Sequence, residues 1–164
     1  MSDIQGLETG HLDAAGGEDL SKKYLTFKVG GQMYGISISN VIEIVKIQEA
    51  TSMPELPYYA KGIINLRGRV VPLIDVNLRF GKAEQEYTDR TCIIIVDIDN
   101  VHVGFIVDAV DEVLDINDDK ISQPPSLSSD ASSRFVVGVG RMEKCIVLLL
   151  NSRMLVSDEM MMGV

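Results

Sequence analysis

Residues 35–44 read GISISNVIEI, and residues 104–113 read GFIVDAVDEV. The two stretches share the pattern G-x-x-[IV]-x-x-V-x-E-[IV] without a gap. An alternating apolar pattern surrounds the start of each stretch. Residues 24–38 alternate around Gly30-Gly31, and residues 93–107 follow the same plan around Asp99-Asn100, which are both turn signals. The repeat therefore predicts two related β-hairpins.

The similarity continues towards the C-terminus with a larger offset. The matched pairs are Gly62 with Gly138, Val70 with Ile146, Val71 with Val147 and Asp75 with Asn151. The extra residues fall between Lys120 and Phe135, in a loop rich in Ser and Pro. We therefore expect two similar units, at about 24–85 and 90–151, each with roughly five short strands. Such units suit small closed β-barrels, because closure removes exposed sheet edges.

The ends of the chain differ from this body. Residues 1–20 are rich in Gly, Asp and Glu, contain no Lys or Arg, and are expected to form a flexible acidic tail. The folded domain is expected at 21–157, followed by a short C-terminal end at 158–164 with three consecutive methionines. Few helices are predicted: one turn within 54–60, Val76–Phe80 capped by Asp75, and a terminal helix at 152–157.

Composition supports an all-β class and limits the possible partners. The chain has 164 residues, 46% of them hydrophobic, and Ile and Val outnumber Ala and Leu, which favours strands. Its net charge of −9 argues against nucleic acid, because phosphate backbones attract basic surfaces. No secretory signal and no apolar run of membrane-spanning length is evident. We expect a soluble, cytoplasmic protein without membrane insertion.

Residues able to support catalysis are few. Cys92 and Cys145 lie far apart in apolar runs, so two buried, reduced thiols are expected. His11 and His102 have no His or Cys neighbour at metal-ligand spacing. No glycine pattern matches a phosphate-binding loop. We therefore expect no catalytic, cofactor or metal site and no enzymatic activity.

Acidic residues in the second half leave one enzymatic alternative open, a small metal-dependent hydrolase. Carboxylates are the ligands of hard cations, but this run lacks the Gly and Glu spacing of a calcium-binding EF-hand loop. Charged, solvated loops are the simpler interpretation. The residues concerned are Asp97, Asp99, Asp108, Asp111, Glu112, Asp115, Asp118 and Asp119.

A hairpin at residues 61–75, reading KGIINLRGRVVPLID, carries a different kind of signal. Its tip is Asn65–Gly68, whereas the second repeat has Arg141–Lys144 there. Two copies that share their strands and differ at the tip suggest a surface role for this tip. An ordinary hairpin turn is the alternative.

The stretches YGI at 34–36, VIEI at 41–44, KGIINLRG at 61–68, VPLID at 71–75 and GFIVD at 104–108 resemble the CheW family. The resemblance covers about residues 22–157. It implies two intertwined, five-stranded barrels of the Src-homology-3 type. It also implies a non-enzymatic adaptor that couples the regulatory domain of the histidine kinase CheA to the cytoplasmic tips of methyl-accepting chemoreceptors.

The resemblance further implies a receptor-binding groove between the barrels. The matching positions are Val41, Glu43 and Arg67 from the first repeat, and Val110 and Val113 from the second. Glu43 and Arg67 are expected to pair across neighbouring strands, with an ordinary surface ion pair as the alternative interpretation. The resemblance assigns no particular residues to kinase binding. The isolated chain is expected to be a monomer. The same adaptor in a pathway controlling pilus motility or gene regulation is an alternative.

Overall fold

The computed structural model describes residues 20–124 and 134–156. Most of the expected acidic tail, part of the Ser-rich loop and the three consecutive methionines lie outside the described residues. The elements are η1 (Leu20–Lys22), β1 (Lys23–Val29), β2 (Gln32–Ser37), η2 (Ile38–Asn40), β3 (Val41–Lys46), β4 (Ala60–Leu66), β5 (Arg69–Asp75), α3 (Val76–Arg79), β6 (Cys92–Ile98), β7 (Val101–Val107), β8 (Ala109–Asp115), η3 (Asp118–Lys120), β9 (Ile121–Ser122), β10 (Val136–Arg141), β11 (Ile146–Leu150) and α4 (Ser152–Leu155).

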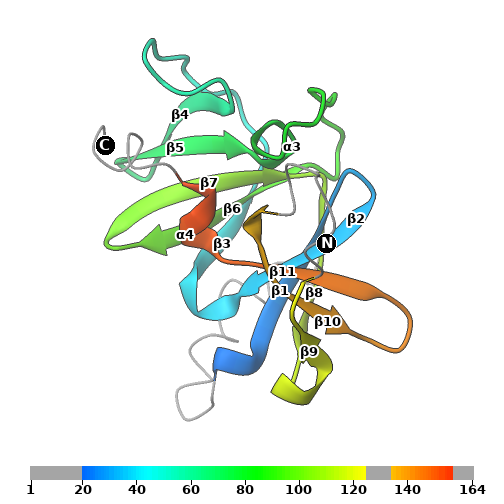
Figure 1. The fold of residues 1–164 in the computed structure, drawn as a ribbon. Helices are drawn as coiled ribbons and strands as arrows, with labels where there is room; N and C mark the ends of the chain where they lie inside the picture. The colour runs from blue at the N-terminus through cyan, green and yellow to red at the C-terminus, as the bar shows by residue number, and fades with distance from the viewer. Residues whose placement is uncertain (1–19, 125–133, 157–164) are drawn as a thin grey trace.

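The strands form two sheets, as the all-β prediction requires (Figure 1). Sheet A has the order β8-β1-β2-β11-β10-β9, and sheet B has the order β3-β6-β7-β5-β4. Sheet A therefore has six strands rather than five, because the two-residue β9 adds to its edge. Each sheet combines strands from both halves of the chain: the β1-β2 hairpin joins four later strands, and the β6-β7 hairpin joins three earlier ones.

The two hairpins predicted from the repeat are confirmed. Gly30 and Gly31 have φ of 59° and 81°, and Asp99 and Asn100 have φ of 53° and 69°. Two consecutive residues in this left-handed region match the twist of the flanking strands, and Gly, Asn and Asp tolerate the conformation best.

The glycine shared by the repeats has a packing reason. Gly35 lies opposite Leu149 where β2 pairs with β11, and Gly104 lies opposite Leu73 where β7 pairs with β5; both pairings are parallel. A Cβ atom at Gly104 would come within 2.6 Å of the Leu73 side chain. Glycine therefore lets the returning strand pack closely at the equivalent point of each sheet.

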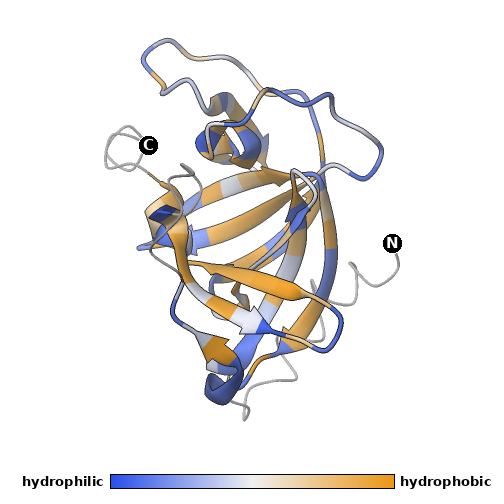
Figure 2. Ribbon diagram, turned by 45° about the vertical axis from the view of Figure 1, so that its right-hand side comes forward, coloured by the Kyte–Doolittle hydropathy of each residue, from blue (hydrophilic) through white to orange (hydrophobic). Residues whose placement is uncertain are grey.

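The buried side chains form three clusters, and Figure 2 shows the apolar residues gathered in the strands. The largest, called here the central core, takes residues from both sheets, including Leu25, Phe27, Val41, Ile44, Val96 and Phe105. A second cluster, with Ile64, Leu73 and Ile95, belongs to sheet B, and a third, with Ile116, Val147 and Leu149, belongs to sheet A. The central core therefore joins the two sheets.

The short helices agree with the sequence predictions in two cases of three. The Asp75 carboxylate accepts a hydrogen bond from the Leu78 N–H at 3.2 Å and caps α3. The predicted terminal helix begins at Ser152 and ends at Leu155 as α4. The helical turn predicted within 54–60 is wrong, because this segment forms non-helical turns before β4.

The prediction of two buried thiols is half right. Cys92 is buried in β6, whereas Cys145 is exposed. Cys145 precedes β11, which begins at Ile146, so it lies in the β10–β11 turn rather than within the apolar strand. Among the described residues, no helix is long and apolar enough to cross a membrane.

Candidate protein-docking site

The candidate residues lie mainly on β3 and β8, which are edge strands of sheet B and sheet A. Val41 and Glu43 are in β3, and Val110 and Val113 are in β8. Val41 is a buried member of the central core, while Val110 and Val113 are partly exposed and pack against it. The structure therefore brings the three valines to one apolar cluster from two different sheets.

Both edge strands contain a β-bulge at the equivalent place. In β3 the register with β6 shifts between Val41 and Glu43, and in β8 the register with β1 shifts between Val110 and Val113. Side chains three residues apart normally point to opposite faces of a strand. The extra residue of the bulge changes this alternation, so that the Val110 and Val113 side chains of β8 both point towards the central core.

Ile44 is a member of the same arrangement that the sequence prediction missed. It is buried in the central core and lies three residues after Val41, as Val113 follows Val110. The internal repeat aligns Ile44 with Val113, and this signal was sufficient to identify it.

Glu43 and Arg67 form an ion pair. Arg67 belongs to the β4–β5 turn, and β3 and β4 are the two opposite edges of sheet B. The expectation of neighbouring strands is therefore wrong for the sheet order. The sheet therefore curves enough for its two edges to approach each other at this ion pair. Thr51, in the segment after β3, also forms an antiparallel bridge with Ile63 of β4.

Arg67 occupies a backbone conformation that disfavours most side chains. Its φ is 54° and that of Gly68 is 85°, so the pair forms the left-handed centre of a tight hairpin turn. The exposed Asn65 side chain accepts a hydrogen bond from the Gly68 N–H at 2.8 Å. Asn or Gly is the usual residue where Arg67 stands. An arginine at this position therefore has a conformational cost. Its side chain is 68% exposed, which leaves the guanidinium open to solvent.

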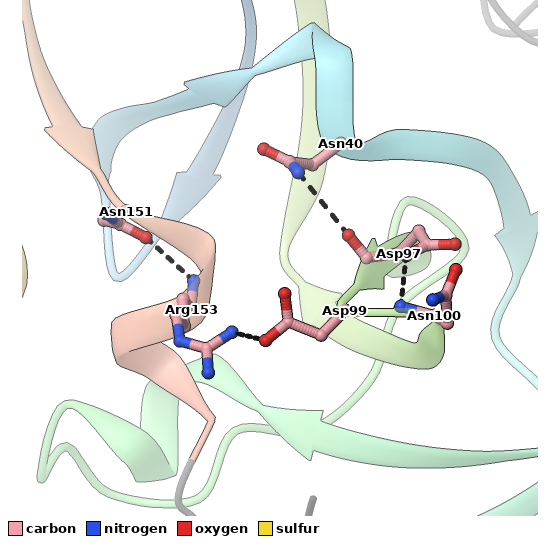
Figure 3. A network of polar contacts seen from close by, with 6 residues as sticks. All are labelled: Asn40, Asp97, Asp99, Asn100, Asn151 and Arg153. Atoms are coloured by element: carbon pink, nitrogen blue, oxygen red, sulfur yellow. Dashed lines mark hydrogen bonds and ion pairs between the residues drawn. The ribbon is translucent and has the colours of Figure 1, made fainter.

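A polar network beside η2 connects elements of both sheets (Figure 3). Arg153 of α4 forms an ion pair with Asp99 in the β6–β7 turn. The Asn151 side chain caps α4 by accepting the Arg153 N–H at 3.0 Å. Asn40, between β2 and β3, donates to the Asp97 carbonyl at 3.4 Å. These contacts tie the end of sheet A to the hairpin of sheet B.

A second set of contacts around α3 also joins the sheets. The Asp108 carboxylate accepts the Gly30 N–H of the β1–β2 turn and the Asn77 side-chain amide of α3, each at 2.8 Å. Arg79 donates to the Leu155 carbonyl at 2.8 Å, and its guanidinium lies 4.3 Å from the ring centre of Tyr59. Two separate groups of polar contacts therefore join the two sheets.

In the part of the chain that the structure describes, the groups able to support catalysis do not converge. Among residues 20–124 and 134–156, no three His, Cys, Asp or Glu side chains are placed to hold a metal ion. Burial and the charge of Arg69 lower the pKa of His102, against the opposing effect of Asp97. Burial raises the pKa of Cys92 to about 11, so this thiol is not activated.

An apolar pocket of about 430 Å³ lies beyond the end of β3. Its lining includes Ile47, Leu73 and Ile106, with Lys61 and Tyr87 also present. None of the five candidate residues lines this pocket, so it is separate from the candidate site.

The comparisons with known proteins agree with this architecture. A family model described as CheW-like domain matches residues 23–160. A probable chemotaxis protein CheW of Rhizobium etli is 35% identical, with 84% of this chain and 88% of that protein covered. The chemotaxis protein CheW of Klebsiella aerogenes is 30% identical, with 96% and 94% covered. The crystal structure of the scaffolding protein TtCheW from Thermoanaerobacter tengcongensis is similar with a TM-score of 0.73 and 36% identity, covering 79% of this chain and 88% of that one.

Proposed function

The chain belongs to the family of CheW-like domains, and from this membership we propose that it couples a histidine kinase of the CheA type to the cytoplasmic tips of chemoreceptors. It is a non-enzymatic scaffold of the chemotaxis type. In this role the protein supplies binding surfaces only, and its output is the activity of the kinase that it holds beside the receptor.

The observation that carries the proposal is the pair of bulged edge strands on the central core. Val110 and Val113 of β8 are partly exposed there, and Val41 of β3 extends the same apolar cluster. A helical partner with an apolar ridge would bury its side chains against such a surface, as helices do in other apolar grooves. The receptor tip, a helical hairpin in this family, is a partner of that kind.

The Glu43–Arg67 pair adds a polar feature to the proposed docking surface. The Arg67 side chain is 68% exposed and the Glu43 side chain only 16%. A fully exposed ion pair contributes about 0–1 kcal/mol to stability; the partly buried Glu43 makes this pair worth somewhat more, yet most of the Arg67 side chain stays accessible to a partner. An arginine in a left-handed turn is thus better explained by recognition, because a guanidinium can bond a carboxylate or carbonyl of a partner.

The direct test uses three purified components: this chain, the cognate kinase and a receptor cytoplasmic fragment. The proposal predicts that the chain binds each partner and that the three assemble into one complex in a pull-down. Arg67→Ala should weaken the receptor interaction. Arg141→Ala is the matched control, because Arg141 is an exposed arginine at the equivalent hairpin of the second repeat and bonds the Asp119 carbonyl at 3.2 Å. Binding to neither partner would overturn the adaptor role.

A further inference from the structure

The ladder between β1 and β8 contains a bulge with an unusual partner. Leu25 pairs with Val113 and Phe27 pairs with Val110, so Thr26 alone faces the two residues Asp111 and Glu112. Figure 1 shows β1 and β8 side by side at this ladder. Two residues opposite one define a bulge, and the extra residue loses its regular ladder hydrogen bonds.

Thr26 supplies the missing hydrogen bonds. Thr26 is fully buried, with 0% of its surface exposed. The Thr26 hydroxyl donates to the Glu112 carbonyl at 2.7 Å, and the Glu112 N–H donates to the same hydroxyl at 3.1 Å. One hydroxyl thus satisfies both backbone groups of the bulged residue, which is possible because a hydroxyl both donates and accepts.

The equivalent bulge in the first repeat has no such partner. In β3 the shift lies opposite Val96 and Ile95 of β6, and the repeat aligns Thr26 with Ile95. Ile95 is buried in the cluster of sheet B and carries no polar group. A β-branched apolar residue therefore fits this place in the fold, and the threonine at position 26 is distinguished by its hydroxyl.

We propose that Thr26 is a positioning residue for the docking surface: its hydroxyl holds the β8 bulge that turns Val110 and Val113 to the same face. This inference rests on the proposed function, because it assigns those two valines to receptor binding. Thr26 is itself buried, so it acts through the register of β8 and not by touching the partner. Without the bulge, side chains three residues apart would point to opposite faces of β8. One of the two valines would then point away from the docking surface.

The test compares Thr26→Val with Thr26→Ser. Valine keeps the shape of threonine and removes the hydroxyl, whereas serine keeps the hydroxyl. We expect Thr26→Val to weaken binding of the receptor fragment about tenfold and to speed hydrogen exchange of the Glu112 amide by about the same factor, as loss of buried hydrogen bonds implies. Binding of the kinase regulatory domain should stay within about twofold of wild type, and Thr26→Ser should restore both affected measurements.

Three results would overturn the inference. Unchanged Glu112 exchange in Thr26→Val would show that the hydroxyl does not hold the bulge. Unchanged receptor affinity with faster exchange would show that the bulge does not position the valines for binding. Equal losses of receptor and kinase binding, not restored by serine, would show a general structural role. If wild type itself fails to bind the receptor fragment, the proposed function fails, and the Glu112 exchange still reports separately on the bulge.

Discussion

Glu43 and Arg67 form an ion pair that joins the opposite edges of sheet B, from β3 to the β4–β5 turn. Glu43 lies two residues after Val41 in β3, and Val41 is a member of the central core. The pair therefore has two proposed roles. It holds the edges of sheet B together, and it forms part of the proposed docking surface. Substitutions can separate these two roles.

Replacement of Arg67 should affect binding more than folding. Arg67→Ala leaves the Glu43 carboxylate, whose side chain is only 16% exposed, without its partner. This should cost about 1–3 kcal/mol, and the melting temperature should fall by no more than about 10 °C. Arg67→Asn should be at least as stable as Arg67→Ala, because asparagine tolerates a φ of 54° better than most side chains. Both variants should lose receptor affinity in a titration. A large loss of stability with normal receptor binding would contradict the assignment.

Lysine substitutions at Val41 and Val113 should give different results because the two residues differ in burial. Val41 is 8% exposed, so Val41→Lys buries an unpaired charge and should unfold much of the protein. Val113 is partly exposed, so Val113→Lys should remain folded and bind the receptor fragment poorly. Circular dichroism and a binding titration distinguish the two. Val137→Lys in β10, at another exposed apolar position, serves as the control and should bind normally.

Tyr87 should make stability depend on alkaline pH. Burial, followed by the hydrogen bond to Asp75, raises the pKa of Tyr87 above its ordinary value of 10.0. The folded state therefore holds the phenol proton more tightly than the unfolded state. This contribution is fully present below pH 10 and is lost as the pH rises above it. Urea titrations at several pH values should show a shallower alkaline decline in Tyr87→Phe, together with a loss of about 1–3 kcal/mol at neutral pH. Identical alkaline profiles would refute this role.

The two cysteines should differ sharply in reactivity. Burial raises the pKa of Cys92 to about 11, whereas Cys145 is exposed at a turn. Since the thiolate is the reactive form, a thiol reagent at pH 8 should modify Cys145 quickly and Cys92 only after unfolding. Mass spectrometry of native and denatured samples measures this directly. Cys145→Ser should leave no fast-reacting thiol, and fast modification in that variant would contradict the burial of Cys92.

Local patterns in the sequence were sufficient to predict the hairpins, the α3 cap and the duplication. The way strands are shared between sheets was harder to predict. Two similar repeats can pair within themselves or exchange their hairpins, and the alternation of apolar residues is the same in both cases. In this fold the hairpins are exchanged between the repeats, so β1 pairs with β8. The bulge held by Thr26 lies in that pairing. That contact joins residues 86 positions apart and leaves no mark in the local pattern.

The errors have similarly specific causes. Cys145 begins an unbroken apolar run in the sequence, yet it lies in the β10–β11 turn, because β11 starts only at Ile146. Glu43 and Arg67 were expected on neighbouring strands, but their contact depends on the curvature of the whole sheet. The family resemblance assigned Val110 and Val113 to the groove, whereas their common direction depends on a bulge that the alternating pattern of a single strand does not predict.

Kinase activity in a reconstituted mixture tests the coupling role most directly. The receptor fragment and the kinase are combined with wild type, Val113→Lys or Val137→Lys, and autophosphorylation of the kinase is measured. We expect wild type and Val137→Lys to make kinase activity depend on the receptor. Val113→Lys should bind the kinase without producing this dependence. Receptor-dependent kinase activity at the wild-type level with Val113→Lys would contradict the proposed docking surface.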